Sequence, residues 1–147
     1  MNLVNVFDTL FGIIKEDFPE KYEDIVKLAK NNRAVLTDGN QLVIFFVNKT
    51  NQLSVSEFIN GDSGNNNSTK YLQFPWGRFD RGIIIEILDG QRTLNEAIQY
   101  GRIDCRGKEI EVITFFRILR IVLFVSSRSP QAYQLWKNFK DSNPNGL

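Results

Sequence analysis

The sequence predicts an α+β protein in which a mixed, mainly antiparallel sheet of about five strands is covered by helices and follows an N-terminal helical pair. Three patterns carry this prediction. Apolar residues recur at helical spacing at the start of the chain, β-rich runs with turn signals fill its middle, and a long apolar helical segment lies near its end. With 147 residues and 42% hydrophobic content, residues 1–147 are expected to form a single domain with its own core.

The first two expected elements are amphipathic helices. Apolar residues at the i, i+3, i+4 and i+7 positions form one face of the first helix, which comprises Leu3, Val6, Phe7, Leu10, Phe11 and Ile14. Pro19 suits the first turn of the second helix, where a missing N–H costs nothing. The apolar face of that helix comprises Tyr22, Ile25, Val26 and Ala29, and we expect it to end at Asn31-Asn32.

A hairpin is expected next. Ala34–Thr37 and Gln41–Val47 are β-rich runs, and the turn signal Asp38-Gly39-Asn40 separates them. Every residue of Leu42–Val47 is apolar, which predicts a central strand covered on both faces.

Two further strands are expected at Leu53–Ile59 and at Lys70–Phe74, the second of which Pro75 should stop. Gly61–Ser68 is polar and reads as a loop, and its single carboxylate, Asp62, makes a metal site there unattractive. We expect Trp76–Phe79 to be a loop.

Asp80 suits the N-cap of a helix that ends near Gly90 and has Ile84, Ile87 and Leu88 on its inner face. Thr93 and Glu96 have the spacing of a capping box and predict another short helix, with Leu94, Ala97 and Ile98 on one face. Gly101 suits the left-handed conformation that ends such a helix.

Arg102–Arg106 alternates outward charges with inward Ile103 and Cys105, which predicts the fifth strand.

In the apolar segment that follows, polar residues recur at every third position, so their direction shifts around the helix axis by about 60° from one to the next. They are Glu111, Thr114, Arg117 and Arg120. Apolar side chains thus surround this helix, so that both of its sides need cover. Ser129 and Pro130 should open a last helix that carries Trp136 and Phe139.

The order of motifs from Gly82 to Gly107, before a long apolar helix, resembles the second half of the sterol-carrier-protein-2 (SCP2) family. Gly90, the Thr93 helix, Gly101 and the Arg102–Arg106 strand carry the resemblance, which extends over roughly Arg33 to Phe124 once the strand-rich stretch is included. It implies a small α+β domain that holds a lipid or another long apolar ligand in a tunnel. The chain departs from the family in its longer N-terminal helical pair and its Asn-rich loop.

The composition excludes several classes of function. Eighteen basic residues against seventeen acidic ones leave a net charge of +1, so neither a nucleic acid nor a strongly anionic partner is indicated. The chain has no histidine and one cysteine, Cys105, which excludes serine triads, most zinc sites and an internal disulfide. Cys105 reads as a buried structural thiol. We expect no enzymatic activity, no cofactor and no metal.

A cytoplasmic location is expected, because the single cysteine suits a reducing compartment and no export signal is recognisable. The segment Ile110–Val125 is too short, and with Arg117 and Arg120 too charged, to cross a bilayer comfortably.

The function that the resemblance implies is binding and carriage of a sterol-like, fatty acyl or isoprenoid ligand in an apolar tunnel. The phenylalanines expected near its walls are Phe45, Phe46, Phe58, Phe74, Phe79, Phe115 and Phe116. The expected ligand-binding residues are Phe46, Phe58, Leu72, Phe74, Trp76, Ile84, Ile87, Leu88, Leu94, Ile98, Tyr100, Ile103, Phe115, Phe116 and Leu119. Trp76 and Tyr100 are expected at the mouth of the tunnel.

Two alternatives stay open at this point. Arg117 and Arg120 could contact a ligand head group, or their stems could cover apolar surface while the guanidinium groups reach water. The chain could instead be an interaction module that uses the second side of the long helix or the face around Trp136 and Phe139. As the family resemblance implies, such a module could dimerise or assist an enzyme of lipid or quinone synthesis. A homodimer and transient membrane contact are compatible with both functions.

Overall fold

The computed structural model describes residues 1–58 and 75–142, along which six helices and five strands follow one another. They are α1 (Leu3–Asp17), α2 (Pro19–Ala29), β1 (Arg33–Thr37), β2 (Leu42–Val47), β3 (Leu53–Glu57), β4 (Trp76–Phe79), α3 (Ile83–Leu88), α4 (Leu94–Gln99), β5 (Ile103–Arg106), α5 (Glu109–Arg128) and α6 (Pro130–Asp141). The predicted α+β class and the N-terminal helical pair are confirmed. The predicted strand Lys70–Phe74 and the loop Gly61–Ser68 lie outside the described residues.

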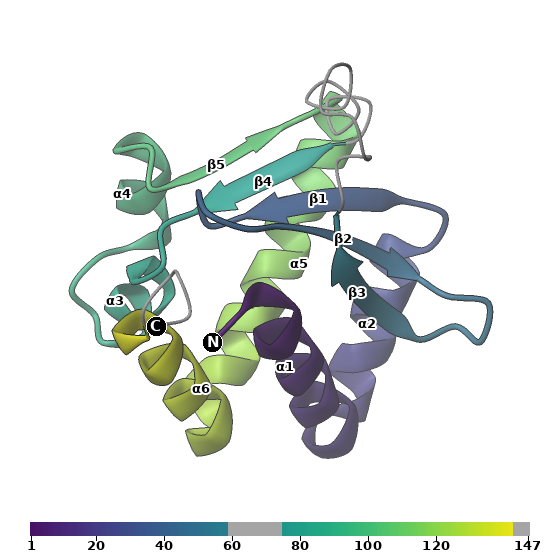
Figure 1. Cartoon of the computed structure of the whole chain (residues 1–147), viewed down its shortest axis with the longest axis horizontal. Helices are drawn as coiled ribbons and strands as arrows, with labels where there is room; N and C mark the ends of the chain where they lie inside the picture. The colour runs from purple at the N-terminus through teal and green to yellow at the C-terminus, as the bar shows by residue number, and fades with distance from the viewer. Residues whose placement is uncertain (59–74, 143–147) are drawn as a thin grey trace.

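The five strands form one mixed sheet in the order β3-β2-β1-β4-β5. Neighbouring strands are antiparallel except β1 and β4, which run parallel. Figure 1 shows α1, α2, α5 and α6 gathered on one side of this sheet, while α4 lies beside one end of β5. The two halves of the chain therefore meet at β1, in the middle of the sheet.

The N-terminal helices follow the sequence pattern. The side chain of Asn2 accepts from the Asn5 N–H and caps α1, whose six predicted apolar residues are all buried. Pro19 stands in the first turn of α2, and the four predicted residues of its apolar face are buried as well. Both helices thus turn their apolar faces to the core under the sheet.

The hairpin of β1 and β2 is confirmed, with Ala34 opposite Phe45. β2 has the predicted central position, between β1 and β3. Full cover on both of its faces is wrong, however, because Phe45 is buried towards the helices whereas Ile44 and Phe46, on the other face, are only half-buried. Continuous apolar character in this strand therefore does not mean burial on both sides.

Trp76–Phe79, expected as a loop, is strand β4. Its residues pair in parallel with β1, Leu36 opposite Gly77, and antiparallel with β5, Gly77 opposite Cys105. These partners are distant in the sequence, so no local turn or alternation pattern marks the strand.

Asp80 does not cap α3, whose N-cap is Gly82. The Asp80 carboxylate instead accepts from Arg102 Nε at 2.7 Å, and the other guanidinium nitrogens of Arg102 donate to the two Glu86 oxygens at 2.9 and 2.5 Å. Arg102 thereby ties β5 to the start of α3. This hydrogen bonding lowers the pKa of Glu86 below its ordinary value of 4.5.

The variant Arg102→Met is expected to lose about 1 kcal/mol of stability at neutral pH, because the ion pairs it removes are partly exposed. The pKa of Glu86 is lower in the folded chain than in the unfolded chain, so its contribution is present above pH 4.5 and is lost as the pH falls through the folded pKa. Urea unfolding at several pH values checks this. The stability of the native chain should fall more steeply between about pH 5 and pH 3 than that of the variant, and parallel curves would contradict the assignment.

The capped helix and the strand after it are confirmed. The Thr93 hydroxyl accepts from the Glu96 N–H, the Glu96 carboxylate accepts from the Thr93 N–H, and Gly101 has a positive φ of 72°. In β5, Ile103 is buried and Cys105 half-buried, both on the side that faces the helices. β5 is thus the edge strand next to β4.

Helices α5 and α6 complete the core. The Ser129 hydroxyl accepts from the Ala132 N–H and caps α6, as predicted. Trp136 and Phe139 are fully buried against the rest of the chain, so the face around them is not available to a partner. The corresponding part of the predicted interaction surface is wrong. Within residues 1–58 and 75–142, no helix combines the length and the apolar character needed to cross a membrane.

Candidate apolar ligand site

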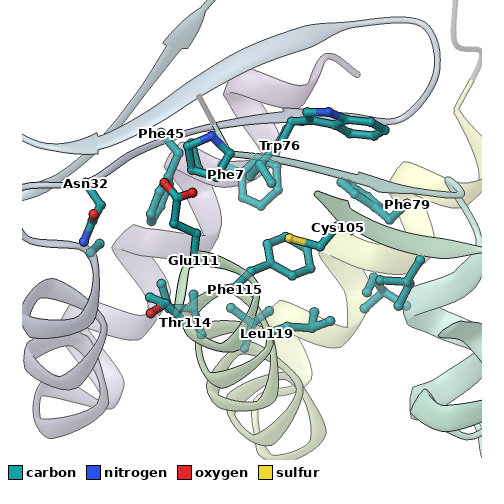
Figure 2. A pocket seen from close by; sticks show the side chains of 18 of the residues that line it. Phe7, Asn32, Phe45, Trp76, Phe79, Cys105, Glu111, Thr114, Phe115 and Leu119 are labelled. Atoms are coloured by element: carbon teal, nitrogen blue, oxygen red, sulfur yellow. The ribbon is translucent and has the colours of Figure 1, made fainter. Parts of the chain in front are cut away.

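A cavity of about 150 Å³ lies between the helix-facing side of the sheet and α5 (Figure 2). Residues from most elements meet around it, and almost all of its surface is apolar. The lining residues are Phe7, Phe11, Ala29, Asn32, Ala34, Leu36, Phe45, Pro75, Trp76, Phe79, Ile84, Ile103, Cys105, Ile110, Glu111, Thr114, Phe115, Ile118, Leu119, Val122 and Trp136.

The sheet side of the cavity follows from the pairing register. Ala34 and Phe45 are directly opposite one another, as are Phe79 and Ile103, and side chains of such pairs share one face. Gly77 lies in the middle of this wall. It leaves the space that the ring of Phe115 occupies, since a Cβ on Gly77 would lie 2.7 Å from Phe115 Cζ. Phe115 thus packs directly on the sheet and narrows the cavity.

The opposite wall is one face of α5. Its lining residues follow helical spacing, as expected for a single face, and are Ile110, Glu111, Thr114, Phe115, Ile118, Leu119 and Val122. Figure 2 shows Phe115 and Leu119 rising from α5 towards the strands. The cavity thus lies on the sheet side of α5. The expected cover on both sides of this helix is wrong, because Ile113 and Phe124, which do not line the cavity, are exposed.

Aromatic rings form the inner end of the cavity. Phe7 makes edge contacts with Phe79 and Trp136, with ring centroids 6.2 and 6.3 Å apart. The indole N–H of Trp136 donates to Ser126 Oγ at 3.0 Å, so this polar group is satisfied and the ring contributes apolar surface to the cavity. A hydrocarbon chain is the chemistry that this end suits.

Polar groups gather at the other end. Apart from the Cys105 thiol and the Trp136 indole, the polar side chains that line the cavity are Asn32, Glu111 and Thr114. Figure 2 shows Glu111 and Thr114 on α5 on the same side of the cavity as Asn32, near Phe45. Ile110, which also lines this end, is 67% exposed, so the cavity opens to solvent here.

The Cys105 thiol faces the cavity but is a poor nucleophile. Burial, together with the charges of Asp104 and Glu111, raises its pKa to about 12. It therefore stays protonated at neutral pH, and only the thiolate is nucleophilic. Within the described part of the chain, no cluster of three or more His, Cys, Asp and Glu side chains could hold a metal ion.

Of the residues predicted from the sequence to bind a ligand, Trp76, Ile84, Ile103, Phe115 and Leu119 line the cavity. Trp76 does so without presenting its ring. Its register partners Val35 and Arg106 place the indole on the far face of the sheet, where the Arg106 guanidinium lies 5.6 Å from it. Leu72 and Phe74 lie outside the described residues. Ligand contact itself stays a prediction for all of them.

The other predicted residues do not line the cavity, for two reasons. Two of them belong to the sheet but lie away from the cavity. The Phe46 side chain is on the face opposite the helices, where the Arg33 guanidinium lies over its ring, and Phe58 follows the end of β3. The rest belong to α3, to the short edge helix α4 with its C-cap, or to the flank of α5. They are Ile87, Leu88, Leu94, Ile98, Tyr100 and Phe116, and Tyr100 is 67% exposed instead of lying at the mouth.

The lining residues that sequence reasoning missed include Phe7, Phe11 and Trp136, which had only been assigned to apolar helix faces. Phe45 and Phe79, expected near the walls, do line the cavity. Glu111, Thr114, Arg117 and Arg120 form one series of polar residues in the sequence. Glu111 and Thr114 line the cavity, whereas the two arginines are exposed and do not. A helical wheel aligned on Phe115 would have separated the two pairs.

No protein-family model matches the chain, and no curated protein matches it. Among solved structures, a chain described as "UbiJ-SCP2 Ubiquinone synthesis protein" is similar over 88% of this chain and 98% of its own length. The TM-score is 0.51 and the sequence identity is 13%. At this identity the likeness shows the fold alone, which is SCP2-like, as the sequence motifs had indicated.

Proposed function

We propose that this chain binds the apolar part of a long lipid-like molecule in the cavity between the sheet and α5, and carries or presents it without transforming it. The observation that carries the proposal is the cavity itself, which is apolar along its length and polar at one open end. The SCP2-like fold supports it. The described function of the similar structure, ubiquinone synthesis, favours an accessory role towards an isoprenoid-like molecule.

The size of the cavity limits what enters it. A volume of about 150 Å³ accommodates roughly a benzene-sized group, whereas pockets that enclose a whole drug-sized ligand measure about 300–1,000 Å³. A slender, flexible chain that enters at one end therefore fits better than a rigid sterol ring system. Each methylene group that leaves water contributes about 0.8 kcal/mol.

Blocking the cavity is expected to abolish binding. Leu119→Trp adds an indole ring to the α5 wall of the cavity. We expect the affinity for diphenylhexatriene, a slender apolar probe whose fluorescence rises on binding, to fall at least about tenfold. The ring would displace apolar surface of the probe worth more than about 1.4 kcal/mol of burial, which corresponds to that factor. Arg120→Trp is the matched control: it adds the same ring at the next position of α5, on the exposed side. Titration with the probe and a far-UV spectrum of both variants check this.

Equal enhancement by the native chain and the Leu119→Trp variant would contradict the proposed site. Native mass spectrometry of the gently purified chain adds a second readout, since a carried lipid appears as extra mass. The same spectrum taken from the Leu119→Trp variant should show the bare chain.

The second candidate is an interaction module, and the outer side of α5 favours it. Ile113 and Phe124 are 46% and 38% exposed there and do not line the cavity. The arginines Arg117 and Arg120 lie between them on the helix. Sedimentation at increasing concentration tests whether this side pairs two copies, and Ile113→Glu should abolish any such dimer without affecting the probe titration.

A further inference from the structure

We propose that the ligand has an uncharged, hydrogen-bond-donating head group, as in a long-chain alcohol or phenol, and that Glu111 selects it against fatty acids. This inference rests on the proposed function, and it narrows the class of ligand. Its basis is the chemistry of the open end, where a carboxylate is the one charged side chain among the described residues that line the cavity.

The three polar side chains at this end offer acceptors. Thr114 Oγ1 donates its proton to the Ile110 carbonyl at 2.8 Å, and Asn32 Nδ2 donates to the Lys30 carbonyl at 3.2 Å. The oxygens of both side chains remain available. Glu111 Oε1 accepts from the Lys108 N–H at 2.7 Å, and a carboxylate has about four acceptor sites, so Glu111 can accept a further proton donor. A head group that donates a hydrogen bond fits this end.

A carboxylate head group fits it poorly. No lysine or arginine of the described residues lines the cavity. The cations next to the polar lining residues along the chain are Lys30 and Arg33, which flank Asn32, and Arg106 and Lys108, which precede Glu111. All four are exposed and none lines the cavity. Arg33 lies over the Phe46 ring on the other face of the sheet, and Arg106 pairs with Asp104 at 3.3 Å. The positive end of the α5 dipole would favour an anion, but Glu109 and Glu111 already provide two negative charges in its first turn. A fatty acid would therefore place its charge beside Glu111 without a partner.

Two probes of equal chain length test this selectivity. Dodecanol and dodecanoate compete with bound diphenylhexatriene on the full chain at neutral pH, both below micelle-forming concentrations. We expect the alcohol to displace the probe at about tenfold lower concentration than the carboxylate, as an unscreened like charge at the mouth would produce. Glu111→Gln keeps the length of the side chain and the capping interaction, because glutamine also serves at this position of a capping box.

In Glu111→Gln, the ratio of the two affinities should therefore fall towards one, because dodecanoate no longer meets a like charge and dodecanol exchanges a charged acceptor for a neutral one. Glu109→Gln is the matched control, since Glu109 belongs to the same helical turn, is exposed and does not line the cavity. It should leave the ratio of the two affinities unchanged.

Equal displacement by both probes from the native chain, or a ratio that Glu111→Gln and Glu109→Gln change alike, overturns the role of Glu111 and leaves the proposed function intact. Failure of diphenylhexatriene and of both amphiphiles to bind overturns the proposed function together with this inference.

Discussion

Replacing Gly77 by alanine is expected to destabilise the fold by about 1–3 kcal/mol and to weaken binding in the cavity, because the added methyl group overpacks a filled position. The new Cβ would lie 2.7 Å from Phe115 Cζ, still closer to Phe115 Cε2, and 3.2 Å from a methyl carbon of Leu36. The Phe115 ring must then leave the sheet wall and move within the space that a ligand would use. Urea unfolding and the diphenylhexatriene titration measure the two effects.

Two controls isolate this contact. Gly12→Ala, at an exposed position of α1 with open space around it, should be neutral or stabilising by up to about 1 kcal/mol. In a Phe115→Leu background the Gly77→Ala change should cost much less, since the shorter side chain relieves the clash. A Gly77→Ala chain of native stability and native probe affinity would show that Phe115 does not rest on the sheet.

The variant Asp38→Ala is expected to lose about 3–5 kcal/mol, the range found when one partner of a buried ion pair is removed. The Asp38 side chain is fully buried and accepts from the Asn40 and Gln41 N–H groups and from Arg81 at 3.1 Å. The guanidinium of Arg81, in turn, donates to the Phe139 carbonyl at 2.9 Å and lies 4.1 Å from the Phe139 ring. One pair thus joins the β1–β2 turn, the start of α3 and the end of α6.

Without Asp38, the buried guanidinium of Arg81 lacks a counter-ion, and its Nε already has no hydrogen-bond partner in the described part of the chain. The double variant Asp38→Ala/Arg81→Met should therefore recover a large part of the lost stability, because both charges are gone. Chemical denaturation of Asp38→Ala, of Arg81→Met and of the double variant measures the coupling. Additive losses would mean that the two side chains act independently.

Local patterns made much of this fold predictable. α1, α2, the β1–β2 hairpin and the helix capped by Thr93 each depend on residues close together in the sequence, and each appears where it was expected. β4 could not be recognised, since Trp76–Phe79 becomes a strand only through its distant partners β1 and β5.

The cavity was harder to predict than the fold, for a physical reason. Residues that line an apolar cavity have the same chemistry as residues that fill a core, and only their positions distinguish them. Phe45 and Phe46 illustrate this, because a shift of one residue in strand register exchanges the face towards the helices for the opposite face. The sequence contains no signal that decides between the two.

The space between the sheet and α5 also has a thermodynamic consequence. An empty cavity lowers the free energy of unfolding by about 24 cal/mol per Å³, because the atoms that line it lack packing partners. A cavity of about 150 Å³ therefore corresponds to a loss of stability of up to about 3–4 kcal/mol. A ligand present at one hundred times its dissociation constant would raise the free energy of unfolding by about 2.7 kcal/mol. Under the proposed function, the empty chain is therefore the more heat-labile form, and the melting temperature should rise with the concentration of the ligand.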